Sequence, residues 1–198
     1  MRLGIFGGTF DPPHLGHVAL AQAAYDQLQL DKVLWVVAGQ SPLKLDRTIT
    51  PAPIRVALVQ AAIVDHPAFE LSRVDLDRPA PHYTIDTLRL LRQQYRTSQL
   101  FFIMGQDSLR DLPKWRHPHQ IIERVWLAVA KRPGARVNLS TLDAIIPNLR
   151  QRIIWLKVPP LDIASSEIQE RLTQRRSVRT MLPPAVYEIV KSKGLYQR

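Results

Sequence analysis

The sequence of 198 residues contains no cysteine, which excludes disulfide bonds, a thiolate nucleophile and cysteine metal ligands. No apolar run approaches the roughly 20 residues that cross a bilayer. The first apolar stretch breaks at Gly7 and Gly8, too early for a secretory signal. No interleaved aromatic and basic pattern indicates a nucleic-acid platform. We therefore expect a cytoplasmic protein whose partner is neither a membrane nor nucleic acid.

The composition is that of an ordinary globular protein, with 45% hydrophobic and 22% charged residues. The length favours one domain with a real core. Lysine and arginine number 27 against 17 acidic residues, a net charge of +10, and a basic protein usually handles something anionic. Two interpretations stay open, because the basic residues are spread along the chain: a positive substrate cleft, or charge scattered over a solvated surface.

Apolar patterns alternate between strand-like and helix-like segments along the chain. Apolar runs predict strands at residues 3–6, 32–38, 69–72, 100–104, 126–130 and 152–157. Helical spacing predicts helices at residues 14–30, 53–65, 85–95 and 184–193. This alternation is typical of the α/β class and predicts a doubly wound, Rossmann-like parallel sheet with helices on both faces. Ligands of such folds bind beyond the carboxyl ends of the strands.

The C-terminal segment, from about residue 160 to 198, is expected to form a helical part of a single domain spanning residues 1–198. Ser166 and Gln169 have the spacing of a capping box, so a helix should begin there. The last predicted helix begins with proline and is followed by Gly194, and glycine commonly ends helices.

The turn after the first strand holds an unusual set of residues, GGTFDPPHLGH at positions 7–17. Its glycines let a ligand approach the backbone, and the following helix start offers N–H groups and a positive dipole end. His14 and His17 are three apart and share a helix face, with Gly16 leaving room for a bulky ligand. We favour a polyphosphate site over a plain turn with incidental histidines. The third interpretation, a His-x-x-His metal site, has no obvious third ligand nearby.

This turn resembles the G-x-F-D-x-x-H-x-G-H motif of nucleotidyltransferases, and most closely that of the bacterial nicotinate-nucleotide adenylyltransferase family. Four further segments are similar to motifs of that family and occur in the same order. They are AGQSPLK at residues 38–44, HYTIDTL at 82–88, IMGQDSL at 103–109 followed by Trp115, and KRPG at 131–134. The resemblance therefore covers nearly the whole chain as one nucleotidyltransferase domain.

The sequence departs from the family pattern at four positions. In the family's Ile-Ser-Ser-Thr-x-Ile-Arg segment, Gln169 stands at the position of the arginine and Ala164 at that of the first serine. His82 replaces a serine, and Leu43 replaces a histidine. The missing arginine is expected to weaken triphosphate binding unless Arg171 or another basic residue takes its place.

The resemblance implies a reaction in which the phosphate of nicotinate mononucleotide attacks the α-phosphorus of ATP, giving nicotinate adenine dinucleotide and pyrophosphate. No general base is needed, because the attacking phosphate is already an anion. His14 and His17 would hold the ATP phosphates as catalytic residues, and Asp11 would orient either the turn or a hydrated metal. Mg²⁺ is the implied cofactor, bridged mainly by substrate phosphates without a protein ligand set. The further residues implied for ATP and phosphate binding are Gly7, Gly8, Thr9, Phe10, Lys44, Ser165 and Ser166.

The implied nicotinate-nucleotide site consists of Tyr83, Thr84, Asp107 and Trp115. Asp107 would accept from a ribose hydroxyl, or else serves as the N-cap of the next short helix. Trp115 would stack on the pyridine ring, or else only packs. Thr84 opens a helix whose start suits a carboxylate, or else only caps it. Lys44 would neutralise phosphate, or else is a solvated loop lysine.

Other functions remain open at this point. A transferase of the same superfamily that acts on nicotinamide mononucleotide, phosphopantetheine or a cytidylyl acceptor is the nearest. An aminoacyl-tRNA synthetase fragment shares the His-x-Gly-His element, although this chain is short for such an enzyme. A basic regulator that binds nucleic acid belongs to a different class, and intact His14 and His17 favour the enzyme over it. A homo-oligomeric state is left open.

Overall fold

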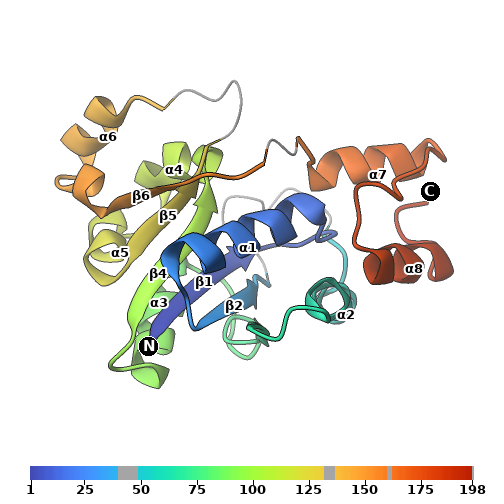
Figure 1. Ribbon diagram of the computed structural model, residues 1–198, viewed down its shortest axis with the longest axis horizontal. Coiled ribbons are helices and arrows are strands. Elements are labelled where there is room, and N and C mark those ends of the chain that lie inside the picture. Colours follow the sequence, from blue (N-terminus) through green and yellow to red (C-terminus); the bar gives the residue numbers. More distant parts are fainter. Residues whose placement is uncertain (40–48, 132–136, 160–161, 198) are drawn as a thin grey trace.

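The computed structural model describes residues 1–39, 49–131, 137–159 and 162–197. Its centre is a six-stranded sheet in the order β3-β2-β1-β4-β5-β6, with every neighbouring pair parallel (Figure 1). The strands are β1 (Arg2–Gly8), β2 (Lys32–Val37), β3 (Phe69–Ser72), β4 (Gln99–Gly105), β5 (Trp126–Ala130) and β6 (Ile153–Leu156). The strand order reverses between β1 and β4. The predicted doubly wound parallel sheet is therefore confirmed.

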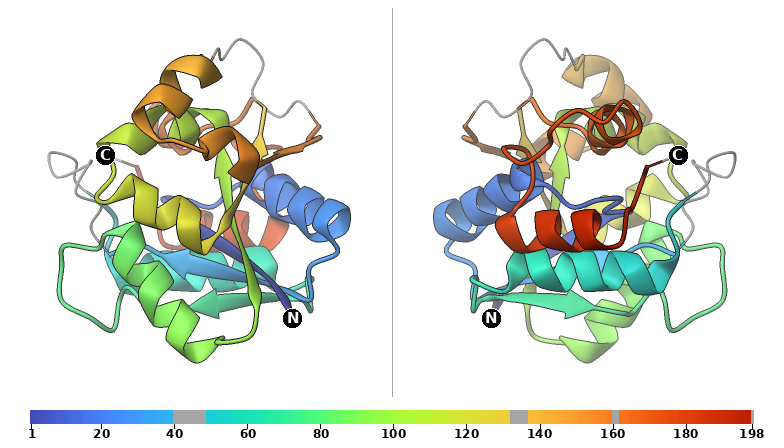
Figure 2. Two further views of the ribbon diagram at one scale, coloured as in Figure 1. Left: turned by 90° about the vertical axis from the view of Figure 1, so that its left-hand side faces the viewer. Right: turned by 90° about the vertical axis from the view of Figure 1, so that its right-hand side faces the viewer.

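Helices cover both faces of the sheet, as predicted, and α8 runs alongside α2 on one of them (Figure 2). The α-helices are α1 (Leu15–Leu28), α2 (Ala52–Ile63), α3 (Thr84–Gln94), α4 (Gln106–Asp111), α5 (Pro118–Arg124), α6 (Leu139–Ile145), α7 (Ser165–Thr173) and α8 (Pro184–Ser192). The described residues also include two 3₁₀ turns, η2 (Leu112–Lys114) and η3 (Leu149–Arg152). None of the described helices combines the length and the apolar character needed to cross a membrane.

The two faces of the sheet support two separate cores, and strand β2 shows why. Val33, Trp35 and Val37 point into the core covered by α1, α2, α7 and α8. Leu34 and Val36 point into the core covered by α3, α4, α5 and α6. A strand buried on both sides must be apolar at every position, which explains the continuous apolar run in the sequence.

The helical spacing of Ile54, Ala57, Leu58 and Ala61 predicts that they line one side of α2, and the structure confirms this in part. Leu58 is buried, while Ile54 and Ala61 are partly buried against the same core. The fully buried residues of α2 are Arg55, Leu58, Val59, Ala62 and Ile63. The charge of the buried Arg55 is satisfied by backbone carbonyls.

The predicted capping box at Ser166 is wrong. Helix α7 begins one residue earlier, with Ala164 as its N-cap, so Ser166 lies within the first turn. With Ala164 as the N-cap, the third helical residue is Glu167, so Gln169 lies too far along the helix to complete a capping box. The Nε2 of Gln169 instead donates to the carbonyl of Asp11 at 2.7 Å.

Candidate active site

A cavity of about 770 Å³ opens at the carboxyl ends of β1 and β4, where the strand order reverses. This is the place where doubly wound folds bind ligands, and the volume falls within the usual range for small-molecule sites. Every predicted site residue that the structure describes lines it: Gly7, Gly8, Thr9, Phe10, His14, His17, Tyr83, Thr84, Asp107, Trp115, Ser165 and Ser166. Lys44 lies outside the described residues. The structure thus brings the set together, while the role of each residue stays a prediction.

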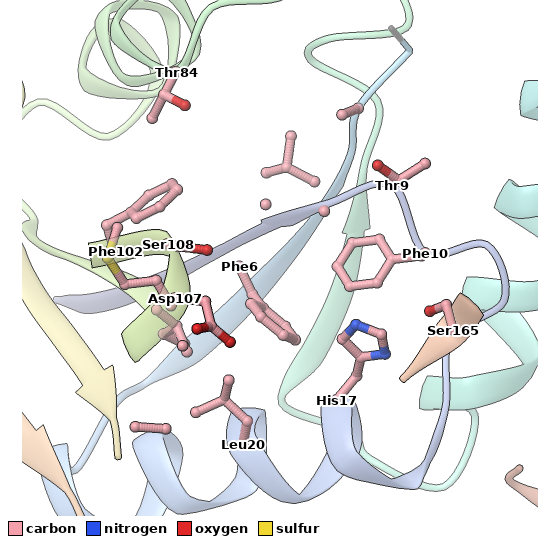
Figure 3. A pocket seen from close by; sticks show the side chains of 18 of the residues that line it. Phe6, Thr9, Phe10, His17, Leu20, Thr84, Phe102, Asp107, Ser108 and Ser165 are labelled. Atoms are coloured by element: carbon pink, nitrogen blue, oxygen red, sulfur yellow. The ribbon is translucent and has the colours of Figure 1, made fainter. Parts of the chain in front are cut away.

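The two histidines lie side by side at the start of α1. Their ring centroids are 3.7 Å apart, and His14 is 6% exposed. His14 is the N-cap rather than the first helical residue, and its backbone N–H donates to Nδ1 of His17 at 3.2 Å. A ring that accepts at Nδ1 carries its proton on Nε2 when it is neutral. His17 is therefore set up as an Nε2–H donor, and its ring faces the cavity (Figure 3).

Gly16 makes room for a protein side chain as well as for a ligand. A Cβ added at Gly16 would lie 3.1 Å from Nδ1 of His14, tighter than most real contacts. We predicted only that this glycine clears space for a bulky ligand. The glycine also allows the two imidazoles to pack together at the helix start.

The turn before α1 is tied to α7. The Ser165 hydroxyl donates to the carbonyl of Pro12 at 2.9 Å, and Gln169 donates to that of Asp11. Gln169, which stands where the family has arginine, thus braces the turn. Arg171, which we considered as a substitute for that arginine, pairs through its Nη2 with Glu167 at 2.8 Å and is not among the described residues that line the cavity.

Arg55 braces the same turn from α2 and was not recognised as important from the sequence. Its guanidinium donates to the carbonyls of Thr9 and Ala38, each at 2.7 Å, and to those of Thr50 and Gly39. Burial lowers the pKa of Arg55, and the nearby carboxylate of Asp11 opposes that shift. One sequence signal could have revealed Arg55: it lies in an apolar helix, three and four residues before Leu58 and Val59, and so on the same buried face.

The wall opposite the histidines is built by α3 and α4. Thr84 is the first residue of α3, and Tyr83 is its N-cap, so Thr84 does not act as the cap. Gly105 is the N-cap of α4, so the capping interpretation of Asp107 is also wrong. The Asp107 carboxylate lies 3.3 Å from Arg110 and points into the cavity, across from His17 (Figure 3).

Trp115 both packs and lines the cavity. Its ring meets Phe102 edge-on, with centroids 5.8 Å apart. Its indole N–H is buried and has no hydrogen-bond partner among the residues that the structure describes. Beside it, the Arg116 guanidinium lies 4.6 Å from the centre of the Tyr83 ring, which fixes that ring at the cavity wall.

A buried polar network, which sequence reasoning missed, holds the start of α3. The Thr87 hydroxyl donates to Asp75 at 2.6 Å, and Arg78 donates to the same oxygen at 2.8 Å. Arg78 also reaches the carbonyl of Tyr83. Asp75 and Arg78 belong to an irregular segment, so no periodicity could reveal them. His82, at a position where the family has serine, bonds through Nε2 to the carbonyl of Arg78.

The described part of the lining is mixed in charge. It contains Lys114, Arg116 and Lys131 together with Asp11, Asp75, Asp107 and Asp111. The described lining is therefore not positive throughout. Within residues 1–39, 49–131, 137–159 and 162–197, no cluster of three or more histidine or acidic side chains is arranged to hold a metal.

Comparisons with known proteins show the family of the chain. Residues 5–171 match the family described as cytidylyltransferase-like. A probable nicotinate-nucleotide adenylyltransferase from Thermomicrobium roseum is 47% identical over 99% of this chain and 92% of its own. One from Thermus thermophilus is 41% identical over the full length of both chains.

The fold also matches a solved structure, Plasmodium falciparum nicotinic acid mononucleotide adenylyltransferase complexed with NaAD. The TM-score is 0.81 at 18% identity, covering 98% of this chain and 97% of the other. At that identity the likeness shows the fold alone, whereas the two bacterial relatives are similar throughout their sequences. The chain therefore belongs to the nicotinate-nucleotide adenylyltransferase family of enzymes, within the cytidylyltransferase-like group.

Proposed function

We propose that the protein transfers the adenylyl group of ATP to nicotinate mononucleotide, giving nicotinate adenine dinucleotide and pyrophosphate. The observation that carries this proposal is that one cavity joins the His14–His17 helix start on one wall to Thr84, Asp107 and Trp115 on the other. Two chemically different walls suit two substrates that must meet. The names of the relatives support the same reaction.

The chemistry is a single displacement at phosphorus. An oxygen of the nicotinate mononucleotide phosphate forms a bond to the α-phosphorus, and the bond from that phosphorus to the pyrophosphate oxygen breaks. The nucleophile is already an anion, so the protein has to align the two phosphates and stabilise charge on the leaving group. We assign that second task to Nε2–H of His17 and to the His14 ring, since pyrophosphate gains charge as it leaves.

The start of α7 would add backbone donors to the phosphate site. The Ser165 hydroxyl is already directed at Pro12, so Ser166 and the free N–H groups of the first turn are the donors that we assign to phosphate. Gly7, Gly8, Thr9 and Phe10 would bring the backbone of the β1 turn close to the same phosphates. Magnesium would enter bound to the ATP phosphates, where it neutralises charge.

The opposite wall would select the acceptor. We assign the pyridine ring to a stack on Trp115 and the ribose hydroxyls to the Asp107 carboxylate. The pyridine carboxylate would lie at the start of α3, where Tyr83 and Thr84 present N–H groups. The Asp75–Arg78–Thr87 network would keep that helix start in place.

The acid nucleotide is expected to be the better acceptor, by about tenfold or more in kcat/KM over nicotinamide mononucleotide. One hydrogen bond to a charged group contributes about 1.5–3 kcal/mol, which corresponds to at least about tenfold. The amide loses the charge and turns an NH₂ group towards N–H donors. Equal kcat/KM values for the two nucleotides, measured under identical conditions, would mean that the N–H groups at the start of α3 do not distinguish the carboxylate from the amide.

The function itself is tested by incubating the protein with MgATP and nicotinate mononucleotide. Pyrophosphate and nicotinate adenine dinucleotide should appear in equal amounts, and neither should appear without the acceptor. Release of pyrophosphate with phosphopantetheine or a cytidylyl acceptor in its place would favour the other transferases of the superfamily. The cytoplasmic location, the absence of nucleic-acid binding and the oligomeric state stay predictions.

A further inference from the structure

A buried carboxylate lies in the middle of the turn that leads into α1. Asp11 is 8% exposed, and both of its side-chain oxygens accept hydrogen bonds. Oδ2 accepts from the backbone N–H of Thr50 at 3.0 Å, and Oδ1 accepts from the hydroxyl of Tyr196 at 2.6 Å. A buried carboxylate is costly without such donors. The conformation of the turn therefore depends on a residue that follows the last helix.

The segment after α8 is aimed at this turn by the way the helix ends. The N–H of Leu195 bonds to the carbonyl of Val190, and the N–H of Gly194 bonds to that of Lys191. This pair of bonds is a Schellman motif, which needs a left-handed residue at Gly194, whose φ is 56°. Leu195 and Tyr196 then pack against the core shared by α1, α2, α7 and α8.

Helix α7 holds the same segment from the other side. The Thr173 hydroxyl donates to the carbonyl of Tyr196 at 3.3 Å. The α7 residue Gln169 donates to the carbonyl of Asp11. The C-terminal label lies beside α7 and α8 in Figure 1, and Figure 2 shows α8 seated on α2. Tyr196 thus links the C-terminal helices to the turn that carries His14 and His17.

We infer that Tyr196 is a positioning residue for adenylyl transfer: its hydroxyl fixes Asp11, and Asp11 fixes the turn that sets the two imidazoles against the ATP phosphates. The inference rests on the proposed function for its kinetic consequence only. Tyr196 is not among the described residues that line the cavity. Its effect reaches the reaction through the two residues between Asp11 and His14, which are Pro12 and Pro13.

The charges around the pair agree with this role. Burial, followed by the Asp11 hydrogen bond, raises the pKa of Tyr196 above its usual range, so the phenol stays a proton donor. The Thr50 side chain and the Arg55 guanidinium act in the opposite direction on that pKa. The Asp11 carboxyl in turn raises the pKa of Arg55 against the effect of burial. Removing the Tyr196 O–H takes away one of the two hydrogen-bond donors to Asp11.

The test is Tyr196→Phe, which removes the hydroxyl and keeps the ring. Its matched control is Tyr187→Phe, on α8 and packed against the same core. Within the described residues, it is the Tyr196 hydroxyl and not that of Tyr187 that bonds to the turn. Adenylyl transfer is measured at a temperature where circular dichroism shows both variants folded. We expect kcat to fall about tenfold in Tyr196→Phe, because displaced imidazoles stabilise the transition state less well. KM for nicotinate mononucleotide should stay within about twofold of the parent value, because the residues assigned to that nucleotide lie on the opposite wall and are not displaced. The control should keep kcat within about twofold.

A second readout does not need activity. The imidazole NMR signals of His14 and His17, assigned by single His→Gln variants among the six histidines, should shift in Tyr196→Phe and not in Tyr187→Phe. In an Asp11→Asn background the additional effect of Tyr196→Phe on kcat should shrink below about twofold, since the two residues act as one unit.

Unchanged kcat together with unshifted imidazole signals in Tyr196→Phe would overturn the inference. An equal loss of kcat in Tyr187→Phe would also overturn it, because the effect would then be one of packing alone. A parent protein that makes no dinucleotide would refute the proposed function instead. In that event the NMR comparison alone would still decide whether Tyr196 positions the histidines.

Discussion

Replacing either His14 or His17 by alanine is expected to lower kcat for adenylyl transfer by at least about a hundredfold, as the loss of one transition-state donor commonly does. The rings lie 3.7 Å apart, and the His14 backbone sets the tautomer of His17. Each substitution therefore removes one donor and loosens the other. We expect the double variant to lose less than the product of the two single effects.

The matched control is His119→Ala, an exposed histidine on α5 that does not line the cavity. It should retain activity within about twofold. Near-normal turnover in well-folded His14→Ala and His17→Ala would remove both residues from the mechanism. Circular dichroism and thermal unfolding establish folding, which matters most for His14 because it caps α1.

A large loss would also be expected if a histidine were a covalent nucleophile, so the two roles need a separate measurement. A single displacement inverts the configuration at the α-phosphorus, whereas two displacements through a phosphoramidate retain it. We expect inversion with a chiral α-thio analogue of ATP. Retention would make one of the imidazoles a nucleophile and not a holder of phosphate.

Removal of divalent cations by EDTA is expected to lower the rate by at least about a hundredfold, and Mg²⁺ alone should restore it. The triphosphate is strongly anionic, and the described cavity lining carries acidic as well as basic residues. The cation must offset that charge while the phosphates align. Restoration that requires Zn²⁺ and fails with Mg²⁺ would revive the His-x-x-His metal interpretation, and full activity in EDTA would contradict the prediction outright.

Much of the site can be predicted from the sequence, because a residue that directly follows a parallel strand must lie at one known edge of the sheet. Parallel strands place their carboxyl ends at one edge, so residues after β1 and β4 must meet there. Gly7 and Gly8 follow the first apolar run, and Gly105 and Asp107 follow the LFFIM run. Local patterns alone therefore bring the GGTFDPPHLGH turn and Asp107 to the same cavity.

The contacts that brace the site do not follow from the sequence, because they join distant segments through single hydrogen bonds. Asp11 and Tyr196 are 185 positions apart. The sequence spacing of Gln169 predicts the last residue of a capping box, yet its side chain donates to the carbonyl of Asp11. Arg55 reads as a surface residue of a helix, yet it is 2% exposed. Short helices such as α5 and α6, with seven residues each, are below the length at which periodicity is informative.

The most direct test of the central claim is one reaction mixture in which acceptors compete for MgATP. Nicotinate mononucleotide, nicotinamide mononucleotide and phosphopantetheine are supplied at equal concentration, and the products are separated and identified by mass. The ratio of products then equals the ratio of kcat/KM values. We expect nicotinate adenine dinucleotide to exceed every other product by about tenfold or more, with one pyrophosphate for each dinucleotide. A different dominant product, or ATP consumed without a dinucleotide, would contradict the assignment of this cavity to nicotinate mononucleotide.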